Sequence, residues 1–153
     1  TVLQPGEVDT VIIAGMGGML MLEILMQSSA VVEKTKRFIL QPQRNIPEVR
    51  QWLQQNGLRI VAEELVLEEG YYYEIMVAVP GRMQLTADEM MFGPCLLQQR
   101  HPLLKAYWRN KKEEYRSFIE KLEREPLLKA AGEERKRQLK DKIKTIDEVI
   151  LCR

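Results

Sequence analysis

Residues 8–14 constrain the fold most, because this segment is an almost unbroken run of apolar, largely β-branched side chains. Such a run is typical of a strand buried on both faces, and strands of this kind occur in parallel sheets that helices cover. The run leads directly into the glycine-rich residues 15–18 and then into a helical stretch at 19–27. This order predicts a strand-and-helix unit of a parallel α/β sheet, with a glycine-rich turn at the carboxyl end of its strand.

A second strand-and-helix unit follows the first. Residues 37–41 form the next strand, which Pro42 stops, and residues 48–55 form a helix that Asn56 and Gly57 end. Two consecutive units of this kind predict two parallel strands joined by a right-handed crossover.

The pattern then changes to an antiparallel one. Residues 58–67 and 71–79 alternate between apolar and polar positions, and a short turn containing Gly70 separates them. Two such strands predict an antiparallel hairpin. We therefore expect an α/β fold in which a parallel sheet ends in an antiparallel hairpin.

Two amphipathic helices are expected after the sheet. Residues 103–125 and 133–151 carry large apolar side chains at steps of three and four, and a break marked by Pro126 and Gly132 separates them. This pattern predicts a coiled-coil-like helical hairpin. The chain is thereby divided into a partial sheet domain at 1–82 and a helical hairpin domain at 83–153.

The composition narrows the class of protein. The 153 residues are 45% hydrophobic and 29% charged, which excludes a disordered chain and a membrane protein. Two cysteines and one histidine fit neither a disulfide scaffold nor a zinc site, so we expect no metal, no membrane association and a reducing, cytoplasmic location.

The near-neutral net charge conceals an asymmetry. The first 80 residues carry 6 basic and 10 acidic side chains, whereas the last 73 carry 17 basic and 12 acidic ones. A basic appendage favours an anionic partner such as nucleic acid. The alternative is a solvated helical surface with mixed charges.

The glycine-rich turn is the first candidate site, because ligands of open α/β sheets bind at the carboxyl ends of the strands. Glycines at such a place let the backbone approach a ligand closely. The turn lacks the spacing of a dinucleotide-binding fingerprint and the Lys-Ser/Thr of a phosphate-binding loop. A tight turn that only packs against its helix is the alternative interpretation.

Further candidates are polar and aromatic residues suited to nucleic acid. Gln41 and Asn45 can donate and accept hydrogen bonds to a base edge, and Tyr72 could stack on a base. The alternatives are helix capping for Asn45 and a half-buried sheet position for Tyr72. Four basic residues of the last helix are suited to phosphate contacts: Arg135, Lys136, Arg137 and Lys140.

Five segments, in this order, resemble the bacterial tRNA (adenine(22)-N1)-methyltransferase family, the TrmK-like proteins. They are residues 12–18, 40–42, 52–57, 72–75 and 92–94. The resemblance covers essentially the whole chain and implies the C-terminal part of a Rossmann-like methyltransferase sheet followed by a helical domain. In the family, three further strands that hold S-adenosylmethionine precede this point, so the chain resembles the C-terminal two-thirds of such an enzyme.

The resemblance implies methyl transfer from S-adenosylmethionine to N1 of an adenine in tRNA. It implies that backbone groups of Ala14, Gly15 and Met16 face the reacting atoms, and that Gly17 and Gly18 let the cofactor and base approach. The basic helices would hold the tRNA, and the chain by itself would be inactive without the other cofactor-binding strands.

Two other functions remain open at this point. The chain could be a non-enzymatic RNA-binding or scaffold module, or a methyltransferase for another substrate. Either way, half a sheet would expose the apolar edge of its first strand, which predicts a homo-oligomer through that edge.

Overall fold

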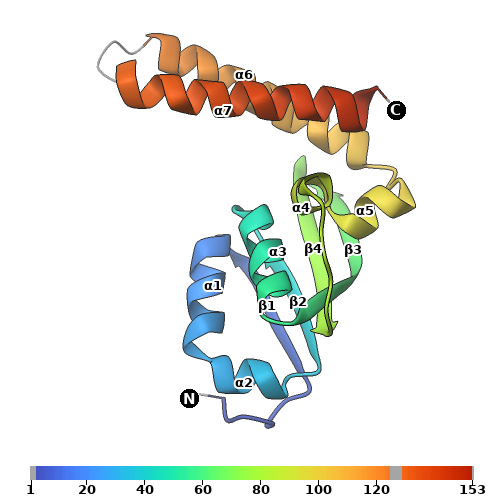
Figure 1. Cartoon of the computed structure of the whole chain (residues 1–153). Coiled ribbons are helices and arrows are strands. Elements are labelled where there is room, and N and C mark those ends of the chain that lie inside the picture. The colour runs from blue at the N-terminus through green and yellow to red at the C-terminus, as the bar shows by residue number, and fades with distance from the viewer. Residues whose placement is uncertain (1–2, 125–128, 153) are drawn as a thin grey trace. The chain divides into compact units, whose positions relative to one another are not determined.

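The computed structural model describes residues 3–124 and 129–152. The chain divides into two compact units, Thr1–His101 and Pro102–Arg153 (Figure 1). The boundary predicted from the sequence lay after residue 82. In the structure, residues 83–101 belong to the first unit and not to the helical one. Each unit is considered by itself below.

The first unit contains a four-stranded sheet with the strand order β1-β2-β4-β3. The first two strands are parallel, and β4 pairs antiparallel with both β2 and β3. The α/β fold with a parallel part and a terminal antiparallel hairpin is therefore confirmed. The strands are β1 (Thr10–Met16), β2 (Arg37–Pro42), β3 (Leu58–Glu68) and β4 (Tyr71–Pro80).

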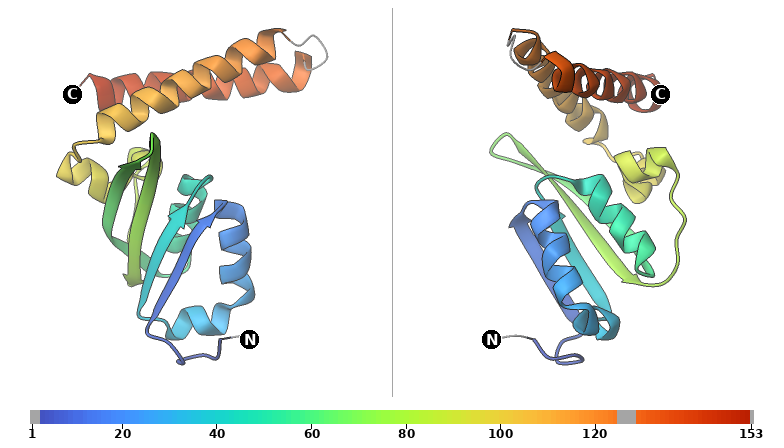
Figure 2. Two further views of the ribbon diagram at one scale, coloured as in Figure 1. Left: turned by 180° about the vertical axis from the view of Figure 1, so that it is seen from behind. Right: turned by 60° about the vertical axis from the view of Figure 1, so that its left-hand side comes forward.

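Helices cover one face of this sheet, as both views of Figure 2 show. The core beneath α1 and α3 is apolar, and Phe38, Leu40 and Met76 of the sheet are fully or almost fully buried in it. The helices of the unit are α1 (Gly18–Gln27), α2 (Ser29–Lys34), α3 (Ile46–Gln55), α4 (Ala87–Phe92) and α5 (Pro94–Gln99).

Three features of the first unit differ from the sequence prediction. The first strand is not buried on both faces, because Ile12 is 66% exposed. It lies at the edge of the sheet, where the described part of the chain supplies no further strand and no helix on its second face. Helices α2, α4 and α5 were not predicted, because each has only six residues and shows too little periodicity.

The second unit consists of two helices, α6 (Leu104–Arg124) and α7 (Lys129–Ile146). A π-helical turn, Asp147–Leu151, follows α7 directly. The two helices run side by side (Figures 1 and 2). The second helix begins four residues earlier than predicted, so Gly132 lies within α7 and does not mark a break. The other residue of the expected break, Pro126, lies outside the described residues.

The seam between these helices is apolar, although Phe118, which lies at one of the apolar steps of three and four in residues 103–125, does not belong to it. Phe118 is 44% exposed, and the neighbouring Ile119 is buried in its place. Among the described residues of the unit, the other buried apolar side chains are Leu104, Tyr107, Trp108, Leu139, Ile146 and Ile150.

Candidate functional site

The glycine-rich turn that follows β1 is shaped by a glycine and by a side chain of β2. Gly15 has φ of +76°, and the pairing register shifts between Ala14 and Met16. The N–H of Gly15 donates a hydrogen bond of 2.8 Å to the Oε1 atom of Gln41. Gln41 therefore holds the turn in place and already uses its carbonyl oxygen for this purpose.

The turn is also fastened to the loop that follows β2. The N–H of Gly18 donates to the carbonyl of Arg44 at 2.9 Å, and the N–H of Gln43 donates to the carbonyl of Met16 at 2.9 Å. A Cβ atom on Gly18 would lie 2.5 Å from the Arg44 carbonyl and 2.9 Å from that of Asn45. Gly18 is thus required by the packing between the two loops.

The other two glycines of the turn face open space. A Cβ atom on Gly15 or on Gly17 would have no neighbour within 4 Å. Gly17 has φ of −66° and ψ of 144°, a conformation that any residue adopts. The backbone at this point is therefore accessible, and the residues present fit a ligand that approaches the main chain closely, such as S-adenosylmethionine or a flat base.

The remaining predicted base contacts lie near the same end of the sheet. Asn45 is exposed and precedes α3 with φ of +56°, but its side chain makes no capping bond and instead lies 3.4 Å from Glu48. The capping role considered for this side chain is thus not observed. Tyr72 is half-buried near the start of β4, and the antiparallel pairing of β4 with β2 places that start at the carboxyl end of β2.

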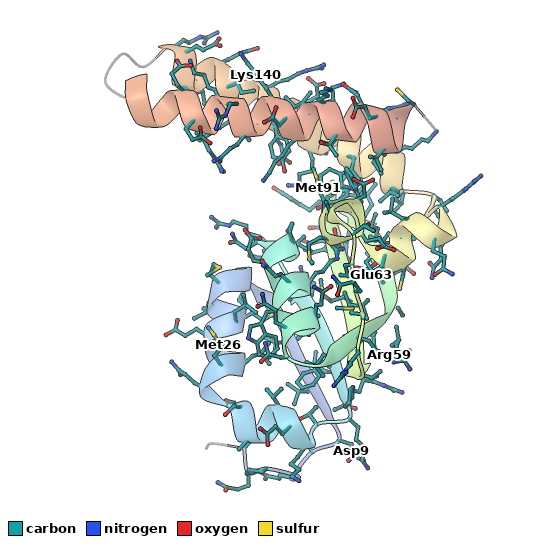
Figure 3. All side chains as sticks on the ribbon, in the orientation of Figure 1. Asp9, Met26, Arg59, Glu63, Met91 and Lys140 are labelled. Atoms are coloured by element: carbon teal, nitrogen blue, oxygen red, sulfur yellow. The ribbon has the colours of Figure 1, made fainter. Side chains whose placement is uncertain are left out.

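The four basic candidates on α7 are not equivalent. Lys136 forms an ion pair with Glu133, and Arg137 pairs with Glu134 at 2.7 Å. In the described part of the chain, Arg135 forms no ion pair, and neither does Lys140, which is labelled in Figure 3. They are the two of the four whose charges remain uncompensated.

The most strongly buried polar cluster was missed by the sequence analysis. Arg50 of α3 is fully buried, and Glu63 and Glu74 are 3% exposed each. Arg50 donates from Nε to Glu63 at 2.9 Å, contacts Glu74 through Nη2, and donates from Nη1 to the carbonyl of Met90 at 3.1 Å. Burial lowers the pKa of Arg50, but Glu74 and Glu63 together raise it above its ordinary value.

Glu63 links this cluster to α5 (Figure 3). Its Oε2 accepts a hydrogen bond of 2.8 Å from the N–H of Cys95. Gly93 has φ of +91°, and a Cβ atom there would lie 2.7 Å from Glu63 and 2.8 Å from Arg50. Burial raises the pKa of the Cys95 thiol, and the charge of Glu63 raises it further.

The sequence did hold a signal for this cluster. Arg50 falls on the apolar stripe that Ile46, Val49 and Leu53 define on α3. A charge at such a position predicts a buried partner. The sequence alone could not identify the partners of Arg50, because Glu63 and Glu74 lie on two strands far away in the sequence.

Two other kinds of feature are absent from the described residues, a membrane span and a metal site. No helix among them is long and apolar enough to span a membrane. No group of histidine, cysteine and carboxylate side chains among residues 3–124 and 129–152 could hold a metal ion.

Comparison with known proteins decides the family. The model of the TrmK family, tRNA (adenine(22)-N(1))-methyltransferase, matches residues 1–148. The chain belongs to the TrmK family. The resemblance inferred from the sequence is thereby confirmed, and the sheet is that of the Rossmann-like fold found in its solved relatives.

Several relatives of this TrmK-family chain are longer than it is. It is 29% identical to the Bacillus subtilis tRNA (adenine(22)-N(1))-methyltransferase over 97% of its own length and 65% of that protein's length. The solved B. subtilis TrmK structure matches with a TM-score of 0.80 at 27% identity, covering 97% of this chain and 66% of the other. A Streptococcus pneumoniae candidate tRNA (m1A22) methyltransferase, solved with S-adenosyl-L-methionine, matches with a TM-score of 0.80 at 34% identity, covering 94% of this chain and 61% of the other. The chain thus spans somewhat less than two thirds of these relatives.

Proposed function

We propose that this chain carries the base-binding side of an enzyme that transfers a methyl group from S-adenosylmethionine to N1 of an adenine in cytoplasmic tRNA. The observation that carries the proposal is the turn at residues 14–18. It lies at the carboxyl end of a parallel strand, is held by Gln41, and leaves its backbone open, in a chain of the TrmK family.

The proposed catalytic groups are backbone atoms of the turn. Ala14, Gly15 and Met16 would line the place where the base and the methyl donor meet, and Gly17 would allow their close approach. Because Gln41 already accepts from the Gly15 N–H, that N–H serves the turn and not the ligand. Gly18, which packs against the second loop, contributes to the site by fixing the turn.

Methyl transfer requires little chemistry from the side chains themselves. Bound S-adenosylmethionine supplies an already activated methyl group, so the residues around it contribute mainly by alignment. Adenine N1 has an in-plane lone pair, and methylation there gives the base a positive charge until an N6 proton is lost. A rigid turn of backbone groups beside the base can orient N1 and stabilise that charge.

Base recognition is proposed for three residues at the same end of the sheet. The amide nitrogen of Gln41 remains a donor for an acceptor atom on the base, since the oxygen of this amide is engaged. Asn45 is exposed in the loop that follows the same strand, and Tyr72 offers a half-buried ring. The base must leave its stack to reach them, which costs a few kcal/mol unless the RNA is already open.

The tRNA body is proposed to bind to the second unit through phosphates. Arg135 and Lys140 would contribute most, because Lys136 and Arg137 are engaged with carboxylates and would have to exchange partners. Binding of tRNA to the chain should weaken steeply with salt. Lys140→Glu should weaken it more than Lys136→Glu, measured by filter binding at two salt concentrations.

Self-association through the β1 edge also remains a proposal, and sedimentation of the chain alone measures it. The enzymatic proposal is tested with the chain fused to the part of the S. pneumoniae relative that it does not match. The fused protein should methylate tRNA from radiolabelled S-adenosylmethionine. A folded fusion that binds the cofactor and tRNA but transfers no methyl group would refute the proposed activity.

A further inference from the structure

The buried Arg50 makes more contacts than neutralisation of its charge requires. Its Nε donates to Glu63 at 2.9 Å, and its Nη2 lies 2.8 Å from the same carboxylate and also contacts Glu74. Its Nη1 donates to the carbonyl of Met90 at 3.1 Å and to that of Met91 at 3.4 Å. All three guanidinium nitrogens are thus engaged, and they join α3 to β3, β4 and α4.

A cluster of this kind fixes geometry more than it adds stability. A buried ion pair is often no more stabilising than well-packed apolar side chains of the same volume. The planar guanidinium, in contrast, holds its donors in a rigid fork that satisfies several partners in one orientation. Because Arg50 lies near the middle of α3 (Ile46–Gln55), this orientation fixes the position of the helix along its own axis.

The carboxylate that receives Arg50 is itself held in place. The Oε2 atom of Glu63, which is labelled in Figure 3, accepts hydrogen bonds from the N–H of Cys95 at 2.8 Å and of Leu96 at 3.4 Å. A Cβ atom on Gly93 would lie 2.7 Å from Glu63 and 2.8 Å from Arg50, so the chain between α4 and α5 packs directly against the cluster. The cluster is therefore a fixed point of the first unit.

The helix α3 also forms one wall of the glycine turn. A Cβ atom on Gly18 would lie 3.0 Å from Val49 of this helix. The loop that leads into α3 accepts the Gly18 N–H at the Arg44 carbonyl, and the N–H of Gln43 in this loop donates to the Met16 carbonyl, both at 2.9 Å. A shift of α3 along its axis would therefore disturb the turn.

The other contacts of α3 constrain this position less or at a greater distance from the turn. Val49 and Leu53 are buried in the core, but apolar packing is not directional. Gln54, at the far end of the helix, accepts a hydrogen bond of 2.6 Å from the N–H of Leu85. Of these two polar anchors, Arg50 is the one adjacent to Val49 and thus to the turn.

We infer that Arg50 is a positioning residue, whose contacts with Glu63, Glu74 and the α4 carbonyls hold α3 and the loop before it against the glycine turn. This role does not depend on the proposed function, but one consequence of it does. If the turn aligns adenine N1 with the methyl donor, a loosened α3 slows methyl transfer, because small misplacements of reacting groups reduce the rate strongly.

Hydrogen exchange of single amides in the 153-residue chain, without cofactor or tRNA, tests the inference. Arg50→Lys keeps the charge but loses the fork of donors. The Gly18 amide should then lose roughly tenfold more protection than the Leu40 amide, a difference of about 1.4 kcal/mol. Leu40 is fully buried in β2 and reports the stability of the sheet. Should Arg50→Lys unfold the chain, Glu74→Gln, which weakens the same cluster, provides the same comparison.

Two control variants separate this role from a general loosening of the chain. Arg37→Lys makes the same replacement at an exposed position on β2 and should change the protection of Gly18 and Leu40 equally or not at all. Gln54→Met removes the anchor at the other end of α3. It should reduce the protection of the Leu85 amide, which loses its acceptor, with no selective loss at Gly18.

Two results would overturn the inference. One is an equal loss of protection at Gly18 and Leu40 in Arg50→Lys, which would show a purely global effect. The other is a selective loss at Gly18 in Gln54→Met as large as that in Arg50→Lys, which would show that release of α3 at either end has the same effect.

Kinetics of the fused protein test the consequence for methyl transfer. Arg50→Lys should lower kcat at least tenfold and leave the KM for tRNA unchanged, because the phosphate contacts are proposed for the second unit. A selective loss of protection at Gly18 with unchanged kcat would support the positioning role and refute the proposed place of the turn in catalysis. Failure of the inference is thus distinct from failure of the proposed function.

Discussion

Two adjacent glycines give the sharpest test of the turn, because the structure assigns them opposite roles. A methyl group on Gly18 would lie 2.5 Å from the Arg44 carbonyl, 2.9 Å from that of Asn45 and 3.0 Å from Val49. Overpacking of this kind costs about 1–3 kcal/mol. Because the clashing atoms are backbone oxygens, the cost lies in the upper part of this range, about 2–3 kcal/mol. Alanine regains about 1 kcal/mol in a helix, so Gly18→Ala should lower the free energy of unfolding by about 1–2 kcal/mol.

The same change at Gly17 meets nothing within 4 Å. Alanine reduces the conformational entropy of the unfolded chain, which raises the free energy of unfolding by about 0.4–1 kcal/mol. It is also a poorer N-cap residue than glycine, which costs a similar amount. The two effects nearly cancel, so Gly17→Ala should change the free energy of unfolding by less than about 0.5 kcal/mol.

Urea unfolding of the two variants, followed by circular dichroism, measures the difference. Methyl transfer by the fused protein then separates the roles further, because Gly17→Ala should impair transfer without loss of stability. Equal stability of the two variants, or full activity of a stable Gly17→Ala protein, would refute the assignment of Gly18 to packing and Gly17 to the ligand.

Three further predictions concern the buried cluster. Arg50→Met removes the positive charge that the buried carboxylates of Glu63 and Glu74 contact and should cost about 3–5 kcal/mol in urea unfolding; a cost below about 1 kcal/mol would contradict these buried contacts. Gly93→Ala forces a methyl group against Glu63 and strains a backbone with φ of +91°, so its melting temperature should fall markedly; an unchanged melting temperature contradicts this packing. Cys95 should react with a thiol reagent near neutral pH much more slowly than the exposed Cys152, because its raised pKa keeps it protonated; equal rates would contradict the burial of Cys95.

Much of the first unit could be predicted from its sequence because the signals there are local. The run at residues 8–14, the glycine turn and Gly70 each specify a strand, a turn or a hairpin from neighbouring residues alone. The same pattern located the candidate site, since glycines after a strand of a parallel sheet lie at its ligand-binding end.

The remaining features depend on contacts between distant segments. Nothing near Gln41 in the sequence shows that its side chain holds Gly15, 26 residues away. The partners of Arg50 lie 13 and 24 residues away on two strands. The composition of β1 predicted burial on both faces, and this was wrong, because burial requires neighbours that the described part of this chain does not supply.

Identification of the methylated nucleotide tests the central claim most directly. The fused protein is incubated with S-adenosylmethionine and either a tRNA with adenine at position 22 or the same tRNA with guanine there, and the digested nucleosides are analysed by mass spectrometry. The account predicts 1-methyladenosine in the first tRNA only, and less of it with the Gly17→Ala variant. Methylation of another atom, or equal methylation of both tRNAs, would contradict it.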